Sequence, residues 1–236
     1  MKRVWTALFA MLAVAMASPA SAQEASKMSP EQAMKVQQEA TTAPAPVAAP
    51  TAQDPENILY VDLSTGGRVA ILMRPDMAPN HIERIKTLVR RGFYDGIIFH
   101  RVIEGFMAQT GDPQGTGQGG SDLPDLKAEF NSLPHLRGTA SMARTQAPDS
   151  ANSQFFIMFM PMTGTMDGNY TGWGRVISGM EFVDKIARGE PPANPSRILK
   201  ASIAADNVPP PPPAIAAPEA APAVQQAAAQ APPPQN

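Results

Sequence analysis

Short runs of alternating hydrophobic and polar residues, separated by glycine-rich turns, dominate the central part of the chain. The first two runs are ILYVDL (58–63) and RVAILM (68–73), and the turn STGG joins them. Alternation of this kind places every second side chain on one face of a strand, so the pair is predicted to form a β-hairpin. Six further strand-like runs follow, at 97–103, 106–111, 138–143, 154–160, 172–177 and 197–204.

Only two segments have the spacing of an amphipathic helix. Between Pro79 and Gly92, apolar residues recur every three to four positions, at Ile82, Ile85, Leu88 and Val89. A second, shorter helix is predicted from Met180 to Arg188, where Gly189 ends it. Many short strands and two helices indicate a mostly β domain that is closed or nearly closed. A parallel α/β sheet is not favoured, because the helices do not alternate with the strands.

The first 22 residues have the order of a secretory signal peptide. Lys2 and Arg3 precede an apolar run from Val4 to Met16, and ASA (20–22) then supplies the small residues of a cleavage site. That run rises about 20 Å as a helix, which is shorter than the roughly 30 Å of a hydrocarbon core. We therefore expect an exported, soluble protein with no membrane insertion after signal cleavage, periplasmic if the source is Gram-negative.

Two further segments, 23–57 and 207–236, are poor in large apolar side chains and rich in alanine, proline and glutamine. The first is predicted to be a low-complexity linker with room for one short helix, from Ser29 to Ala40. The second is predicted to be a disordered tail, and its five consecutive prolines (209–213) suit a spacer or a polyproline ligand. Residues 58–206 remain, and they have the length of one domain.

Composition excludes several classes of function. The chain has 19 lysines and arginines against 21 acidic residues, so it lacks the basic surface of a nucleic-acid-binding protein. The absence of cysteine excludes disulfides, a thiol nucleophile and zinc–thiolate sites. Nothing in the sequence requires a dimer, and a monomer is expected.

Neither a metal nor a nucleotide cofactor is predicted. The three histidines, His81, His100 and His135, are not spaced as metal ligands, and His81 is expected on the exposed side of the first helix. GTGQGG (115–120) matches the glycine pattern of dinucleotide sites, but SDLPDL follows it where a helix is required. A flexible or tightly turned loop is therefore predicted there. A pair of catalytic carboxylates stays open, because the fold can bring any two acidic residues together.

The stretch FHRVIEGFMAQTGD (99–112) carries the most specific signal. On a strand, Arg101 falls on the same side as Phe99 and Ile103. An arginine in phase with apolar residues is either a charge at a strand edge or a cation held at an apolar pocket. An aromatic ring, a thioether and an amide follow within nine residues. Each alone suggests core packing, but their combination favours a binding site.

This stretch and four others resemble the cyclophilins, a family of peptidyl-prolyl cis-trans isomerases. The others are GTG (115–117), GTASMAR (138–144), SQFFI (153–157) and DGNYTGWGRVISGM (167–180), all in family order. The resemblance spans about 58–206 and implies a closed eight-stranded antiparallel β-barrel capped by two α-helices. It also implies an enzyme without a cofactor that acts on proline-containing, unfolded or partly folded polypeptides and aids their folding.

The resemblance further assigns roles to individual residues. Arg101 occupies the position of the family's catalytic arginine, and Gln109 that of the glutamine that positions the arginine and contacts substrate. Substrate binding is implied for Phe106, Met107 and Phe156 around the proline ring, for Ala143, Arg144 and Gln154 along the peptide groove, and for Met166 and Tyr170 beside the pocket. The family makes its contact at Arg144 largely through the backbone, so this side chain is expected to matter less.

Two departures from the family pattern concern one wall of the pocket. The family's Trp-Leu pair before the DG turn appears as Thr165-Met166, and its histidine after that turn as Tyr170. Threonine supplies neither an indole face nor its N–H, although Met166 can refill part of the wall. We expect weaker binding of cyclosporin-type ligands and a reshaped pocket. Two alternatives to an isomerase stay open: a peptide-binding chaperone with little turnover, and a scaffold that works through the proline-rich tail.

Overall fold

The computed structural model describes residues 49, 51 and 54–210. The predicted signal peptide (1–22), most of the predicted linker and the tail beyond residue 210 lie outside the described residues. Among the helices that are described, none is both long enough and apolar enough to cross a membrane.

Eight strands and three α-helices make up the described chain, so a mostly β fold is confirmed. All eight predicted strands are present, though most are shorter than predicted. The first helix runs as predicted, the second ends earlier, and a third one of four residues was not predicted. The strands are β1 (Ile58–Leu63), β2 (Gly67–Met73), β3 (Arg101–Ile103), β4 (Met107–Thr110), β5 (Thr139–Met142), β6 (Phe155–Met158), β7 (Gly172–Ser178) and β8 (Ile198–Ile203). The helices are α3 (Pro79–Arg90), α4 (Thr163–Met166) and α5 (Met180–Asp184), with short 3-10 helices η1 (Pro55–Asn57) and η2 (Ala204–Asp206).

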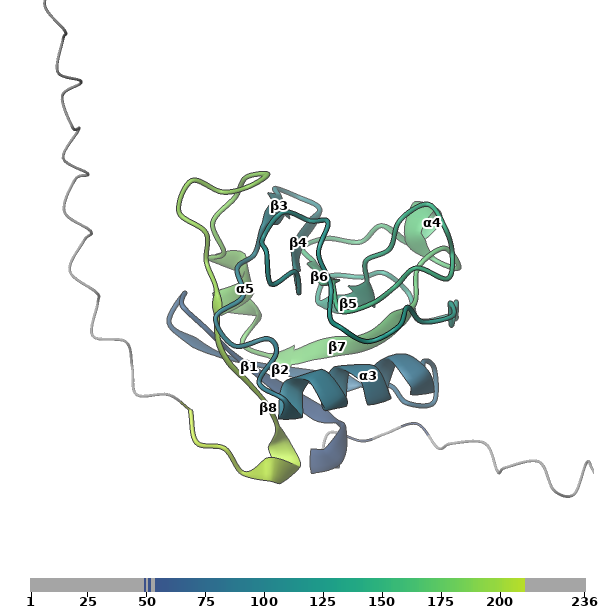
Figure 1. The fold of residues 1–236 in the computed structure, drawn as a ribbon, viewed down its shortest axis with the longest axis horizontal. Helices are drawn as coiled ribbons and strands as arrows, with labels where there is room; N and C mark the ends of the chain where they lie inside the picture. Colours follow the sequence, from purple (N-terminus) through teal and green to yellow (C-terminus); the bar gives the residue numbers. More distant parts are fainter. Residues whose placement is uncertain (1–48, 50, 52–53, 211–236) are drawn as a thin grey trace, which may run out of the picture. The chain divides into compact units, whose positions relative to one another are not determined.

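The strands form one antiparallel sheet in the order β3-β4-β6-β5-β7-β2-β1-β8. Figure 1 shows them following one another around a curved surface, with α3 along one side. Irregular registers in the β1–β8, β2–β7 and β5–β7 pairs contribute to this curvature, since a bulge bends a strand and increases its twist.

The predicted closed barrel is wrong, because the sheet is an open half-barrel. Its two edge strands, β3 and β8, are not joined by a ladder. Only Ile98 and Arg197, which lie just outside them, form a single antiparallel bridge. The predicted strand 97–103 is irregular up to His100, which leaves β3 three residues long and too short to close the sheet. The alternation of side chains had predicted that Phe99 shares the side of Arg101. Because 97–100 is not a regular strand, Phe99 instead packs in the main core with Val102.

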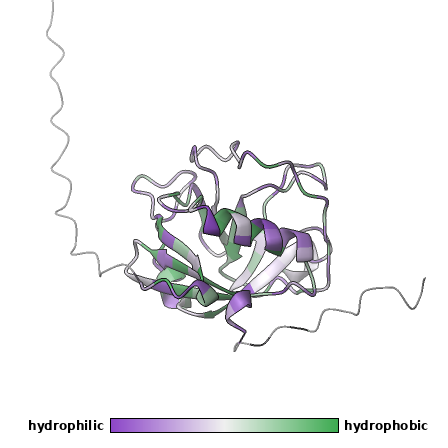
Figure 2. Cartoon of the chain, turned by 60° about the horizontal axis from the view of Figure 1, so that its bottom comes forward, coloured by the Kyte–Doolittle hydropathy of each residue, from purple (hydrophilic) through white to green (hydrophobic). Residues whose placement is uncertain are grey.

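The main core lies between the sheet and α3. Pro79 begins this helix, where a missing N–H costs nothing, and the chain leaves it through Gly92 at a φ of +70°. Ile82, Ile85 and Leu88 are fully buried, and each such side chain contributes about 1.5–3 kcal/mol relative to an exposed one. Figure 2 shows hydrophilic and hydrophobic residues interleaved along this helix, as its sequence predicted.

His81 is buried, which corrects its predicted exposed position. It lies in the first turn of α3, and its Nδ1 is 2.6 Å from Oε2 of Glu129. The same carboxylate accepts hydrogen bonds from the backbone N–H groups of Asn80 and His81. A carboxylate from a distant loop thus satisfies N–H groups that a helix start leaves unpaired, which explains why the histidine faces inward.

Gly111 ends β4 at a point where the sheet leaves no room for a side chain. Its φ is +90°, and a Cβ there would lie 2.4 Å from the carbonyl oxygen of Ser153. Gly111→Ala is therefore expected to lower the free energy of unfolding by about 2–3 kcal/mol, as a urea titration would show. Gly164→Ala is the matched control, because nothing lies within 4 Å of a Cβ at that position in α4. Equal stability of the two variants would contradict this account of the β4 end.

Candidate active site

Neighbouring strands place three of the predicted site residues in one row. Arg101 pairs with Gln109 across β3 and β4, Gln109 with Phe156 across β4 and β6, and Phe156 with Ser141 across β6 and β5. Residues directly opposite in an antiparallel sheet point to the same face. The sheet register therefore brings together groups that are far apart in the sequence.

A cavity of about 210 Å³, lined mainly by residues with apolar or aromatic side chains, opens beside this row. We call it the apolar pocket, and it is lined by Arg101, Phe106, Met107, Gln109, Ala143, Arg144, Phe156, Met166 and Tyr170. Met107, Phe156, Met158 and Met166 form a buried cluster of their own, separate from the main core, and so give the pocket a packed floor. Nine of the ten predicted site residues line this one cavity, and Gln154 lies next to it.

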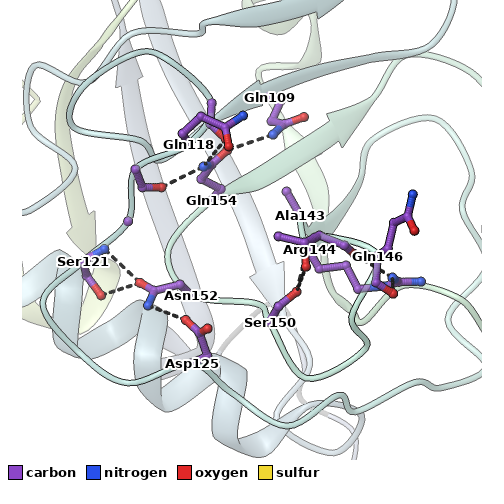
Figure 3. Close-up of a pocket in the computed structure, with 14 residues that line it drawn as sticks. Gln109, Gln118, Ser121, Asp125, Ala143, Arg144, Gln146, Ser150, Asn152 and Gln154 are labelled. Atoms are coloured by element: carbon purple, nitrogen blue, oxygen red, sulfur yellow. Dashed lines mark hydrogen bonds between the residues drawn. The ribbon is translucent and has the colours of Figure 1, made fainter.

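A larger cavity of about 590 Å³, lined mainly by polar residues, adjoins the apolar pocket and shares Gln109, Ala143 and Arg144 with it. We call it the polar groove. Figure 3 shows side chains from several loops pointing into it, with Gln109 and Gln154 facing each other at one end. Gln109 Nε2 donates to Gln154 Oε1 at 2.8 Å, and Asn152 bridges Ser121 to Asp125. The two cavities therefore adjoin, and they differ in the kind of residue that lines them.

Arg101 is held at the pocket mouth by Glu190, a contact that sequence reasoning missed. Its Nε donates to Glu190 Oε2 at 2.7 Å, and both side chains are about half exposed. Two backbone hydrogen bonds between Val102 and Gly189, of 2.8 and 2.9 Å, fix Glu190 beside the arginine. Gln109 was predicted to position the guanidinium, but in the structure it bonds to Gln154 instead.

The loop after β4 is folded around the carboxylate of Asp112, which explains the glycine-rich sequence 115–120. Asp112 is buried, and its oxygens accept hydrogen bonds from the backbone N–H groups of Gln114, Thr116, Gly117 and Gly119. Burial alone would raise the pKa of Asp112, but these donors and the Thr116 hydroxyl hold it below its usual value. Gln154 Nε2 donates to the carbonyls of Gly117 and Gly119, so this loop also fixes one wall of the polar groove.

A second buried network supports the pocket floor from behind. His135 Nδ1 lies 2.8 Å from Asp167 Oδ1, and its Nε2 lies 2.8 Å from Ser141 Oγ. The imidazole stacks on Phe156, with ring centroids 6.3 Å apart. Ser141 is fully buried, so this Ser-His-Asp set cannot present a nucleophile to substrate. Its position indicates that it holds Phe156 in place, and no short-range sequence motif could have revealed it.

The two departures from the family pattern have different outcomes. Thr165 is exposed in α4 and lies outside the group of residues that lines the pocket, whereas Met166 is buried and lines it. Tyr170 also lines the pocket and meets Phe156 edge to face, with centroids 5.6 Å apart. Weaker cyclosporin binding stays a prediction. Among the described residues, no group of three histidine or acidic side chains is arranged to hold a metal ion.

Comparison with known proteins identifies the class to which this fold and site belong. Residues 60–203 match the family described as cyclophilin type peptidyl-prolyl cis-trans isomerase/CLD. A probable peptidyl-prolyl cis-trans isomerase of Brucella suis is 50% identical over 172 residues, which cover 66% of this chain and 87% of that protein. Peptidyl-prolyl cis-trans isomerase B of Bacillus subtilis is 36% identical over 132 residues, covering 56% and 91% of the two chains.

Solved structures agree with the sequence comparisons. The crystal structure of cyclophilin AquaCyp293 from Hirschia baltica has a TM-score of 0.61 and 30% identity, and the match covers 66% of this chain and 77% of that one. A cyclophilin-type isomerase of Cryptosporidium parvum, crystallised in the presence of the dipeptide Ala-Pro, has a TM-score of 0.58 and 27% identity, covering 62% and 98%. The chain belongs to the cyclophilin family, and it is an enzyme of the peptidyl-prolyl cis-trans isomerase class.

Proposed function

We propose that this enzyme accelerates X-Pro isomerisation in exported polypeptides and thereby aids their folding, with Arg101 as its catalytic residue. The observation that carries the proposal is the position of Arg101 at the mouth of an apolar pocket lined by Phe106, Met107 and Phe156. Such a pocket suits a pyrrolidine ring, and the adjoining polar groove suits the rest of a peptide.

The reaction requires no covalent step. Rotation about a peptide bond has a barrier of roughly 18–20 kcal/mol, because it breaks amide resonance. Without a catalyst, X-Pro exchange takes tens to hundreds of seconds at 25 °C, which is slow enough to limit folding. An enzyme need only bind the twisted bond more tightly than either planar isomer.

Arg101 has the chemistry for this differential binding. In the twisted state the proline nitrogen regains its lone pair and becomes a hydrogen-bond acceptor. Since Nε of Arg101 donates to Glu190, the terminal nitrogens are the donors that can reach substrate. A guanidinium is always charged, and a donor aimed at developing electron density in a partly dry pocket is worth more than one in water. The apolar pocket would hold the proline ring while the carbonyl group of the preceding residue rotates.

Gln109 has a narrower role in this proposal than the family pattern implies. Its bond to Gln154 fixes it where the apolar pocket meets the polar groove, opposite Arg101 in the sheet register. We place it as a substrate contact in the groove, together with Ala143, Gln154 and the backbone of Arg144, while Met166 and Tyr170 form the far wall of the pocket.

The proposed location of the enzyme in the cell rests on the sequence of the N-terminus. The basic start, short apolar run and ASA end of residues 1–22 support export, and the periplasm as destination in a Gram-negative source. The Ala-Pro dipeptide named for the Cryptosporidium relative supports proline-containing peptides as substrates. The chain is proposed to act as a monomer. Mass spectrometry of the secreted form tests the first point, and a chain that begins at Gln23 is expected.

The decisive experiment for the reaction is cis-trans exchange of an Ala-Pro peptide, followed by NMR with the chain from Gln23 onward. Catalytic amounts of enzyme are expected to bring the exchange of the proline signals from minutes into the range of seconds or faster. A folded protein that suppresses aggregation of an unfolded client yet leaves this exchange unchanged would be a binding chaperone, and the isomerase proposal would fail.

A further inference from the structure

The side chain of Arg144 lies between two aromatic rings at the junction of the apolar pocket and the polar groove. Its guanidinium carbon is 4.9 Å from the ring centroid of Tyr170 and 5.6 Å from that of Phe130. Both distances are within the range at which a cation is attracted to the face of a ring. Arg144 also lines both cavities, so a shift of its side chain would alter both.

Hydrogen bonds fix the plane of this guanidinium. Nε and Nη2 both donate to the carbonyl of Asn169, at 3.1 and 2.9 Å, and Nη1 donates to the carbonyls of Thr145 and Gln146, at 2.8 and 3.2 Å. The side chain therefore joins the segment after β5 to the segment before β7, on which Tyr170 lies. The fork of an arginine suits this arrangement, because it donates in two directions within one plane.

Tyr170 is consequently held from both sides. Arg144 covers one part of the ring, while Phe156 and His135 approach it edge-on, with centroids 5.6 and 6.4 Å away. The ring lines the apolar pocket but is itself only partly buried, so packing alone does not fix it. The wall that α4 contributes is the flexible side chain of Met166, since Thr165 points to solvent.

We infer that Arg144 is a positioning residue: its guanidinium clamps Tyr170 as a rigid aromatic wall and so replaces, from the opposite segment, the stiffness that α4 does not provide. This inference rests on the proposed role of the apolar pocket in binding the proline ring. It reverses the expectation that the Arg144 side chain matters less than its backbone. The clamp is expected to affect binding of the substrate's proline ring and not the rate of rotation, because Arg144 stacks on Tyr170 and does not contact the reacting bond.

A double-mutant cycle tests the clamp. We would measure the Kd of an Ala-Pro peptide by NMR titration for the wild type, Arg144→Ala, Tyr170→Ala and the double variant. Arg144→Ala is expected to weaken binding about fivefold, the size of a single cation–π contact of intermediate exposure. The double variant is expected to bind no more weakly than Tyr170→Ala. Unchanged binding by Arg144→Ala, or losses that multiply in the double variant, would overturn the inference.

Two further variants separate stacking from charge and from general loss of an arginine. Arg144→Lys keeps the charge but not the planar fork, so it is expected to bind as weakly as Arg144→Ala; restored affinity would mean that charge alone acts. It also serves if the alanine variant does not fold. Arg90→Ala is the matched control, because Arg90 also joins two separate segments, through the carboxylates of Glu56 and Asp206, and lies away from both cavities. Its Kd is expected to equal that of the wild type.

A readout without peptide keeps this test independent of the proposed function. The ring-proton shifts of Tyr170 are expected to move in Arg144→Ala and Arg144→Lys and to stay unchanged in Arg90→Ala. If the wild type failed to accelerate exchange, the isomerase proposal would fall while these shifts still reported on the clamp. If the ring-proton shifts of Tyr170 did not change in the Arg144 variants, the inference of a clamp would be wrong, whatever the rate of cis-trans exchange.

Discussion

Replacing Arg101 by alanine is expected to reduce kcat/KM for an Ala-Pro peptide by roughly 10²–10³, the usual cost of removing one donor aimed at transition-state charge. The loss should appear mainly in kcat, because the bond to the proline nitrogen forms only when the peptide is twisted. Arg101→Lys keeps a positive charge but not the geometry in which Nε binds Glu190 while the terminal nitrogens stay available. An intermediate rate is expected for it.

The fold should not change in these Arg101 variants. The side chain is 44% exposed, and its pair with Glu190 lies at the surface, where such pairs contribute about 0–1 kcal/mol. Thermal unfolding and the amide NMR spectrum of Arg101→Ala are therefore expected to match the wild type. A folded Arg101→Ala enzyme with normal kcat would show that another group stabilises the twisted bond.

Asp112→Asn is expected to lower the free energy of unfolding by about 3–5 kcal/mol, because buried donors would lose a charged acceptor. Oδ2 accepts hydrogen bonds from Thr116, Gly117 and Gly119, and an amide nitrogen there would face N–H groups instead. Urea titration at pH 7 measures the difference. Asp149→Asn is the control, since Asp149 is exposed and accepts one bond, from Ala128 N, so its loss should stay near 1 kcal/mol.

The contribution of Asp112 should also depend on pH. The folded structure lowers the pKa of this carboxyl below the value of about 3.9 that aspartate has in an unfolded chain. Its stabilising effect is thus fully present above that value and is lost as the pH falls through the folded pKa. The stability difference between wild type and Asp112→Asn is expected to be constant from pH 5 to 8 and to shrink below pH 4. A difference that does not shrink at all below pH 4 would mean that the loop does not depend on the charge.

Local patterns were enough to predict the strands, because period-two alternation and glycine turns are properties of neighbouring residues. The length of β3 and the open edge of the sheet depend on how 97–100 packs against the segment before β8, and no local pattern records that. The short helix α4 was not predicted, because TGTM (163–166) has no apolar period. His81 was placed on the wrong side of its helix, since the carboxylate that draws it inward comes from Glu129, 48 residues away.

In the candidate site, too, the sequence identified some residues and missed others. The family resemblance led to residues that the structure gathers around the two cavities. It did not lead to the partners of those residues, because Glu190 lies 89 positions from Arg101, and Asp167 lies 32 from His135. Such contacts are made by loops whose course the sequence does not specify. For Arg144 the resemblance pointed to the backbone, but in the structure its side chain makes an extensive set of contacts.

The two hydrogen bonds between Val102 and Gly189 have a consequence for how the enzyme meets an extended peptide. An exposed edge strand offers free N–H and C=O groups on which another extended chain can add. Beside Arg101, the outward-facing N–H and C=O of Val102 are already taken by Gly189, and β3 ends after three residues. A proline-containing peptide that reaches this edge finds no template for sheet growth there. Binding beside Arg101 is thus kept apart from the addition of a strand to the sheet.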